Sequence, residues 1–156
     1  MKKQEASKTL LIGIGNSGRE DDGLGWAFVE QVEQSNFFDG DCQYRFQLNL
    51  EDAELISHYE QVIFVDAHQG ELAAGFLFSN CEANAGTGFS THQLLPESAL
   101  YLCQQLYEKV PQAWVMAIQG HQWQLKEGLS QEAQNNLGNA LAWFRTMTGK
   151  LSKTFA

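Results

Sequence analysis

A short, uninterrupted apolar segment near the start of the chain is the feature that most limits its possible folds. Residues 9–14 read Thr-Leu-Leu-Ile-Gly-Ile and run into a glycine-rich turn. A strand without alternating polar residues is typical of a sheet that is covered on both faces. Sheets of that kind are mostly parallel and occur in α/β proteins. The segment therefore predicts the first strand of an α/β domain.

Predicted strands and helices alternate along the rest of the chain. The further strands are expected at 44–48, 61–65, 75–78 and 113–118, and the helices at 23–34, 51–56, 94–108 and from an N-cap at Ser130 onward. Only residues 66–74 separate the third strand from the fourth, which is too short for a helical crossover, so the fourth strand is expected to be antiparallel. The predicted fold is a three-layer α/β/α sandwich with a twisted, mostly parallel five-stranded sheet.

The length and composition fit one folded domain. The chain has 156 residues, of which 44% are hydrophobic, and this is enough for a single packed core. No linker or repeat divides it. We expect a flexible N-terminal segment at 1–8, one domain at 9–150 and a C-terminal tail at 151–156.

The charge and the cysteines limit partners and compartment. Nineteen acidic and ten basic residues give a net charge of −9, which argues against binding to nucleic acid or to an anionic membrane. No apolar run is long enough for a signal peptide or a membrane span. Three widely spaced cysteines without a CxxC pair suggest free thiols in a reducing compartment. A cytoplasmic monomer is the expectation.

Several polar residues follow the predicted strands. In open α/β sheets ligands bind beyond the carboxyl ends of the strands. The polar features expected at that edge are the loop 15–22, Asp66 and His68, His92, and the segment 119–121. A functional site is therefore predicted there.

The glycines after the first strand satisfy a dinucleotide-binding pattern. Residues 13–18 read Gly-Ile-Gly-Asn-Ser-Gly. The predicted helix begins only after Glu20, Asp21 and Asp22, however, and these acids would repel a pyrophosphate from the helix N-terminus. No acidic residue ends a strand at the position where a ribose would be bound. A dinucleotide is therefore disfavoured, and a tight turn with acids that favour the helix dipole is the plainer explanation.

Two carboxylates and one imidazole form the strongest constellation. Asp22, Asp66 and His92 are all expected at the same edge of the sheet. Two carboxylates and a histidine are a common ligand set for Ni, Zn, Mn or Fe with open coordination positions. Each residue taken alone has a structural explanation as a cap or a packing residue. Together they predict a metal site.

The remaining candidates are weaker. His68 and His121 are alternative ligands or hydrogen-bonding partners of ligands, although solvated loop histidines are the simpler interpretation. Cys81 and Cys103 are expected to be buried, and no serine or cysteine has the sequence context of an activated nucleophile.

Three motifs together resemble those of the nickel–iron hydrogenase maturation endopeptidases. Residues 11–16, Leu-Ile-Gly-Ile-Gly-Asn, and 21–25, Asp-Asp-Gly-Leu-Gly, resemble the opening signature of that family. Residues 62–67, Val-Ile-Phe-Val-Asp-Ala, resemble its second motif, and Ser-Thr-His at 90–92 its histidine motif. The order and the separations of the motifs also agree with the family, over essentially the whole chain to residue 118.

The resemblance implies both a fold and an activity. Members of this family have a twisted five-stranded sheet with helices on both sides. They remove a C-terminal extension from the precursor of a hydrogenase large subunit after nickel insertion. The metal-contacting positions of the family correspond to Asp22, Asp66 and His92. In this interpretation the nickel belongs to the precursor, the large-subunit precursor is the partner, and no organic cofactor is needed.

Two alternatives from other classes are left open. One is a nucleotide- or metabolite-binding α/β module without proteolysis. The other is a non-catalytic chaperone that senses nickel in a partner. For the endopeptidase itself, the metal could polarise the scissile carbonyl or activate water, or it could only position the substrate while a carboxylate acts as general base.

Overall fold

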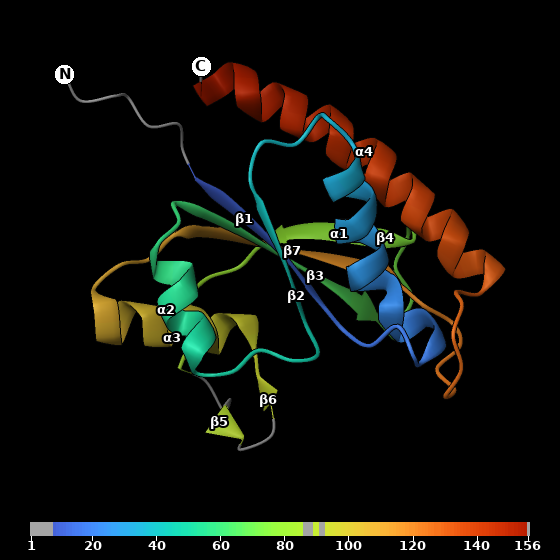
Figure 1. The fold of residues 1–156 in the computed structure, drawn as a ribbon, viewed down its shortest axis with the longest axis horizontal. Helices are drawn as coiled ribbons and strands as arrows, with labels where there is room; N and C mark the ends of the chain where they lie inside the picture. Colours follow the sequence, from blue (N-terminus) through green and yellow to red (C-terminus); the bar gives the residue numbers. More distant parts are fainter. Residues whose placement is uncertain (1–7, 86–88, 91–92, 156) are drawn as a thin grey trace.

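A five-stranded mixed sheet forms the centre of the molecule (Figure 1). The computed structural model describes residues 8–85, 89–90 and 93–155. The strand order is β2-β1-β3-β7-β4, where the strands are β1 (Thr9–Ile14), β2 (Asp41–Arg45), β3 (Gln61–His68), β4 (Phe76–Asn80) and β7 (Gln112–Gln119). Strands β2, β1, β3 and β7 are parallel, and β4 pairs antiparallel with β7. The short strands β5 (Phe89–Ser90) and β6 (Gln93–Leu94) form a separate pair.

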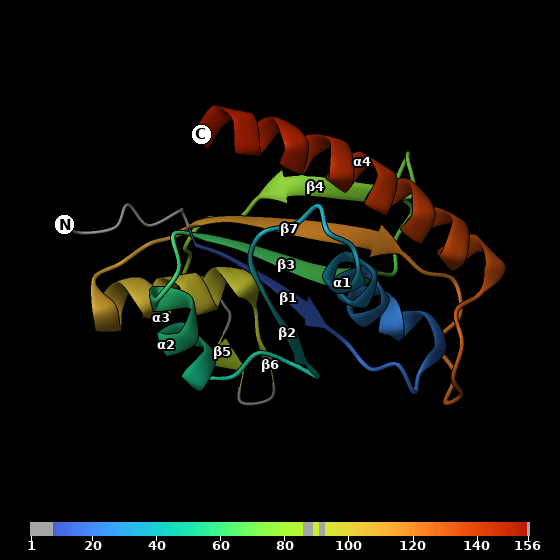
Figure 2. The same cartoon turned by 45° about the horizontal axis from the view of Figure 1, so that its top comes forward.

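Helices cover both faces of the sheet, as Figure 2 shows. Helices α1 (Leu24–Gln34) and α4 (Gln131–Phe155) lie on one face, and α2 (Glu51–Ser57) and α3 (Pro96–Tyr107) lie on the other. Each face has its own apolar core. Phe28 of α1 and Phe144 of α4 are buried in one, and Ile56 of α2 and Leu100 of α3 in the other. The predicted three-layer α/β/α architecture is confirmed.

Most predicted elements are found, with one strand displaced. The antiparallel β4 is confirmed. Strand β2 ends at Arg45, so the prediction that it continues to Leu48 was wrong. Phe46 instead lies on the surface, 69% exposed, and Leu48 forms an isolated bridge with Leu94. Helix α4 continues to Phe155 and includes residues 151–155, where a tail was expected.

Ser130 caps the last helix as predicted. Its Oγ accepts a hydrogen bond from the Ala133 N–H at 3.1 Å. Ala133, Leu137 and Phe144 are buried on the side of α4 that faces the sheet. The cap and the apolar spacing therefore fix both the start of α4 and its buried face.

Helix α1 touches the sheet through backbone atoms. A Cβ atom added to Gly25 would lie 2.5 Å from the carbonyl oxygens of both Ile14 and Val65. A Cβ atom on Gly13 would lie 2.6 Å from the Gly25 oxygen. Only glycine allows this approach, so the two glycines set how close α1 lies to β1 and β3.

Replacing Gly25 by alanine should therefore destabilise the fold by about 2 kcal/mol or more, because backbone atoms of two strands would have to move. Gly138→Ala is the matched control. Gly138 lies on α4 with no atom within 4 Å of an added Cβ, and alanine there should stabilise the helix by up to about 1 kcal/mol. Urea denaturation of both variants checks this, and equal effects would contradict the packing argument.

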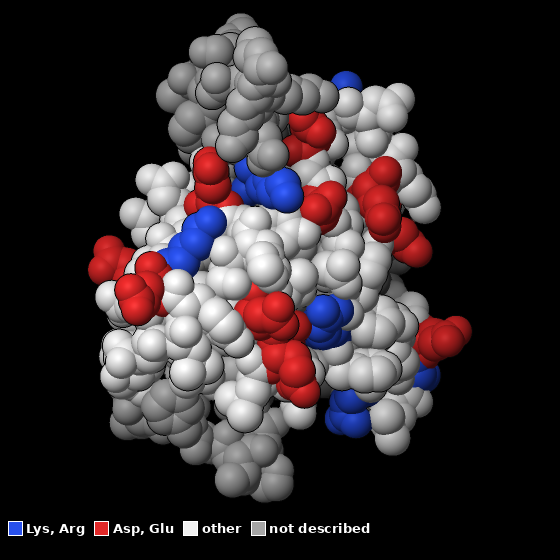
Figure 3. Space-filling model, turned by 60° about the vertical axis from the view of Figure 1, so that its left-hand side comes forward, with Lys and Arg blue, Asp and Glu red and all other residues white. Residues whose placement is uncertain are grey.

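On the face drawn in Figure 3, acidic and basic side chains are interspersed, and the described residues there form no large continuous basic area. Among the described helices, none combines the length and apolar character needed to cross a bilayer.

Candidate functional site

The loop after β1 holds Asp22 against the end of that strand. The Asn16 N–H donates to the Asp22 carbonyl at 3.0 Å, and the Asn16 side chain accepts from the Gly18 N–H at 2.8 Å. Gly15 has a φ of +146°, and an added Cβ would lie 2.1 Å from the Asp22 carbonyl oxygen. The loop therefore folds back tightly, and this turn requires glycine at position 15.

Asp66 lies at the carboxyl-terminal end of β3, beside the strand that leads to Asp22. Burial raises the pKa of the Asp66 carboxyl to about 7; the Ala67 N–H, 2.8 Å from its Oδ1, lowers the pKa, and the charge of nearby Asp22 raises it. Burial also raises the pKa of Asp22, against the opposing effects of the Arg19 charge and the Asn16 N–H. The charge of Asp22 thus acts on the buried Asp66 carboxyl, which indicates that two predicted site carboxylates lie near one another.

This pair has the chemistry of a cation site. Two carboxylates with raised pKa values are costly to ionise together in the absence of a positive charge. A nearby cation lowers that cost, and carboxylate oxygens are common ligands of divalent cations.

The third predicted ligand, His92, lies outside the described residues. Among residues 8–85, 89–90 and 93–155, no group of three or more His, Cys, Asp or Glu side chains is arranged to hold a metal ion. The complete set of Asp22, Asp66 and His92 therefore stays a prediction.

The other two histidine candidates lie at the same edge. His68 is exposed at the end of β3. It borders, with Asp66, a cavity of about 550 Å³ whose apolar lining includes Phe64 and Val115. His121 is exposed, and its backbone N–H donates to Asp21. The cavity gives Asp66 an open neighbouring space of the size that ligand pockets have.

Asp21 has a structural role that the sequence did not reveal. Its carboxylate is fully buried and accepts hydrogen bonds from the N–H groups of His121, Gln122 and Ser130 and from the Ser130 hydroxyl, at 2.7–2.9 Å. Burial by itself would raise the Asp21 pKa, but these hydrogen bonds outweigh it and leave the pKa below its usual value. The acid therefore joins the 3₁₀ turn Glu20–Gly23 to the loop between β7 and α4.

Glu20 reinforces this connection. Its N–H donates to the Lys126 carbonyl at 2.8 Å, and its Oε1 accepts from the Gln124 N–H at 2.9 Å. Glu20 has a φ of +48°, which is unusual for a residue with a side chain. The expectation that Glu20 and Asp21 serve only the helix dipole was therefore incomplete. Both acids fix the loop that carries Asp22 by hydrogen bonds to the loop between β7 and α4.

Burial disfavours the reactive thiolate form of the three cysteines. Cys81 and Cys103 are buried, as predicted. Burial raises the pKa of Cys42 to about 11 and that of Cys81 to about 12, with further increases from neighbouring carboxylates. Burial also raises the pKa of Cys103 against the effect of Lys109. A protonated thiol is a poor nucleophile.

The structure also agrees with the argument against a dinucleotide. Helix α1 begins at Leu24, and the 3₁₀ turn Glu20–Gly23 separates it from the glycines of residues 13–18. Three acidic residues therefore stand in sequence between the glycines and the helix, although the N-cap Gly23 packs against Ser17 of the turn.

Solved structures of hydrogenase maturation proteases share this fold. The [NiFe] hydrogenase maturation protease HycI from Thermococcus kodakarensis superposes with a TM-score of 0.69 at 19% identity, covering 92% of this chain and 94% of that chain. The hydrogenase maturating endopeptidase HybD from Escherichia coli gives a TM-score of 0.71 at 18% identity, covering 88% and 89%. A hydrogenase 2 maturation peptidase from a Thaumarchaeota archaeon gives 0.67 at 18%, covering 92% and 99%. No protein-family model and no curated protein sequence matches the chain.

Neighbouring acids should lose stability to different extents on the same substitution. Asp21→Asn should lower the free energy of unfolding by about 3 kcal/mol, because an amide nitrogen would face donors that now bind a carboxylate. Asp22→Asn should cost less than about 1 kcal/mol, since burial already disfavours the charged form. Chemical denaturation at pH 7 measures both, and equal losses would contradict these roles.

Asp66 should make stability depend on pH. In the metal-free protein its pKa of about 7 exceeds the unfolded value. Between about pH 4 and 7 the folded state therefore holds a proton that the unfolded state has already released. Asp66 therefore stabilises the fold less as pH rises through 7. When the pH is raised from 5 to 8, the free energy of unfolding of Asp66→Asn should increase relative to that of wild type by on the order of 2 kcal/mol. Denaturation in a chelator checks this, and a pH-independent difference would contradict it.

Proposed function

We propose that the chain is an endopeptidase that removes a C-terminal extension from the nickel-loaded precursor of a nickel–iron hydrogenase large subunit. The observation that carries the proposal is that Asp22, in the loop after β1, and Asp66, at the end of the neighbouring β3, lie at the carboxyl edge of the sheet, in a fold shared with hydrogenase maturation proteases. Neither fact alone would suffice, because fold does not determine activity.

In this proposal the nickel is part of the substrate. Asp22, Asp66 and His92 contact the nickel ion of the precursor, so that only a loaded precursor is held in the position for cleavage. The cavity beside Asp66 offers space for the chain around the scissile bond. The metal then polarises the carbonyl or lowers the pKa of a water, or a carboxylate acts as general base on that water. The enzyme acts in the cytoplasm, where its thiols stay free.

The direct test compares two forms of the precursor. The purified chain is mixed with nickel-loaded and with nickel-free large-subunit precursor, and the precursor mass is followed. Loss of a C-terminal peptide from the loaded form alone supports the proposal. A stable complex without cleavage would instead favour the nickel-sensing chaperone. Saturable dinucleotide binding without any effect on either precursor would favour the nucleotide-binding module.

Substitutions in the proposed nickel-reading residues should stop processing. Asp22→Ala, Asp66→Asn and His92→Ala should each reduce the cleavage rate roughly 100-fold or more, because each removes a ligand of the substrate nickel. Asp39→Ala, at an exposed acid away from this edge, is the control and should cleave normally. Circular dichroism establishes that the variants are folded. Cleavage at the wild-type rate by Asp22→Ala and His92→Ala would contradict the assignment of these residues to the nickel-reading site.

A further inference from the structure

Strand β2 is an open edge of the sheet. It pairs with β1 on one side, and no described element pairs with its other side (Figures 1 and 2). The Arg45 carbonyl accepts from the Gly15 N–H at 2.9 Å, so Arg45 directs its backbone groups toward β1. Residues alternate in this respect along a parallel strand, so Cys42 and Tyr44 direct their N–H and C=O groups outward. The Tyr44 carbonyl also accepts from the Arg45 side chain at 2.9 Å. Such an edge can pair with an extended chain.

An aromatic surface lies along this edge. Trp26 of α1 contacts Tyr44 and Phe46, with ring centroids 6.0 and 5.2 Å apart. The Trp26 Nε1–H donates to the Arg45 carbonyl at 2.9 Å, which fixes the ring beside the strand. Phe46 is 69% exposed despite this contact, so the edge of β2 continues into an exposed apolar surface.

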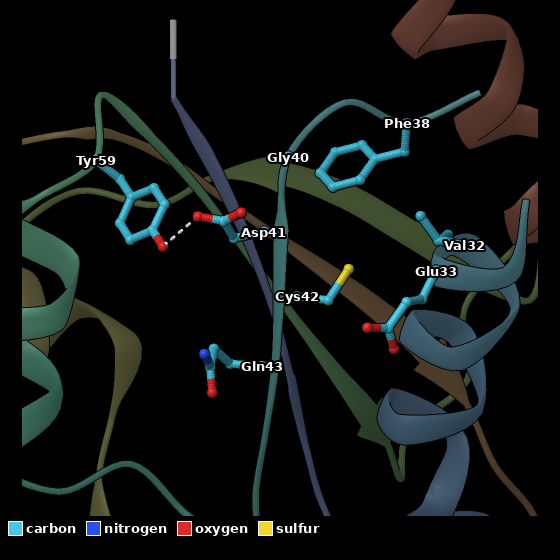
Figure 4. Close-up of a pocket in the computed structure, with 8 residues that line it drawn as sticks. All are labelled: Val32, Glu33, Phe38, Gly40, Asp41, Cys42, Gln43 and Tyr59. Atoms are coloured by element: carbon cyan, nitrogen blue, oxygen red, sulfur yellow. Dashed lines mark hydrogen bonds between the residues drawn. The ribbon is translucent and has the colours of Figure 1, made fainter. Parts of the chain in front are cut away.

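Carboxylates border the same surface. Trp26, Glu30 and Glu33 lie at helical spacing on α1, and Glu33 accepts from the Tyr44 hydroxyl at 2.6 Å. Figure 4 shows the Cys42 side chain pointing toward α1, on the side where Glu33 lies. Two cavities, of about 350 and 380 Å³, adjoin the strand. Their described linings carry five carboxylates and no lysine or arginine: Glu33 and Asp41 in one, and Glu20, Glu30 and Glu127 in the other.

We propose that the outer edge of β2 and the adjoining surface of Trp26, Glu30, Glu33 and Tyr44 bind an extended, arginine- or lysine-bearing segment of a protein partner. The segment adds as a strand to β2. Its cationic side chains lie over the Trp26 and Tyr44 rings and against the two glutamates, which combines cation–π and carboxylate contacts. An acidic partner segment would be repelled, and a neutral one would gain only the backbone pairing.

The edge leads to the candidate site. Arg45 at the end of β2 is paired with Ile14 at the end of β1, and Gly23, next to Asp22, lines one of the two cavities. A segment bound along β2 thus extends toward Asp22. We identify this segment as part of the hydrogenase precursor that is held away from the scissile bond, and this identification rests on the proposed function.

The test uses a defined peptide and the full chain. The probe is acetyl-Thr-Arg-Thr-Arg-Thr-Arg-Thr-amide, added to ¹⁵N-labelled protein. The amides of Cys42 and Tyr44 and the indole N–H of Trp26 should shift, and hydrogen exchange at the two amides should slow at least about three-fold. The same peptide with citrulline in place of arginine keeps the shape without the charge and should bind at least about five-fold more weakly.

Charge variants separate this surface from general attraction to an acidic protein. Glu30→Gln with Glu33→Gln should weaken binding about five-fold, because glutamine keeps an acceptor for Tyr44 but removes both charges. Glu54→Gln with Glu60→Gln, at exposed acids away from this surface, removes the same charge and should leave the affinity unchanged. Equal weakening by both pairs, or equal affinity for the citrulline peptide, would overturn the proposal. Protection of the two amides that rises with protein concentration, without peptide, would assign the edge to a second copy and also overturn it.

Failure of this inference can be told apart from failure of the proposed function. The peptide assay needs neither nickel nor cleavage. If loaded precursor is processed but the peptide does not bind at β2, the docking surface is wrong and the activity stands. If the peptide binds and no precursor is cleaved, the docking surface stands as a binding site and its identification with the hydrogenase precursor fails.

Discussion

The close contact between α1 and the sheet determines the geometry of the candidate site. Gly13 and Gly25 let backbone meet backbone, so the helix lies directly on β1 and β3. The loop that joins β1 to α1 is then confined to the small space above the carboxyl ends of these strands. Asp22 is part of that loop, and Asp66 ends the neighbouring strand. The two acids interact electrostatically because Gly13 and Gly25 have no side chains to hold α1 away from the sheet.

A buried carboxylate completes this arrangement. Asp21 and Asp22 are chemically identical neighbours, yet one is held ionised by four hydrogen-bond donors and the other is pushed toward its protonated form by burial. The first acid secures the loop that carries the second. This division of roles is typical of sites in which structural groups orient the reactive ones.

Much of this architecture could be predicted from the sequence. The continuous apolar runs of β1 and β3 and the short connection before β4 are local signals, and Ser130 is a local cap. Because parallel strands end at one edge, they also place Asp22 and Asp66 together. The end of β2 could not be predicted, since the alternation of Tyr44, Phe46 and Leu48 continues after pairing with β1 stops. The partners of Asp21 are about a hundred residues away in sequence, and burial that raises the pKa of Asp66 depends on packing that no local pattern encodes.

The bond between Asp21 and Ser130 spans 109 positions of the chain. Asp22 and Asp66 both leave the ribosome long before Ser130 does, but the loop that orients Asp22 cannot be secured until the last helix begins. Closing so large a loop is a late event in folding, because its entropy must be offset by contacts that already exist. A nascent or C-terminally truncated chain would therefore carry both acids without the arrangement between them. The fold thereby delays the assembly of its candidate site until the segment that includes Ser130 has been synthesised.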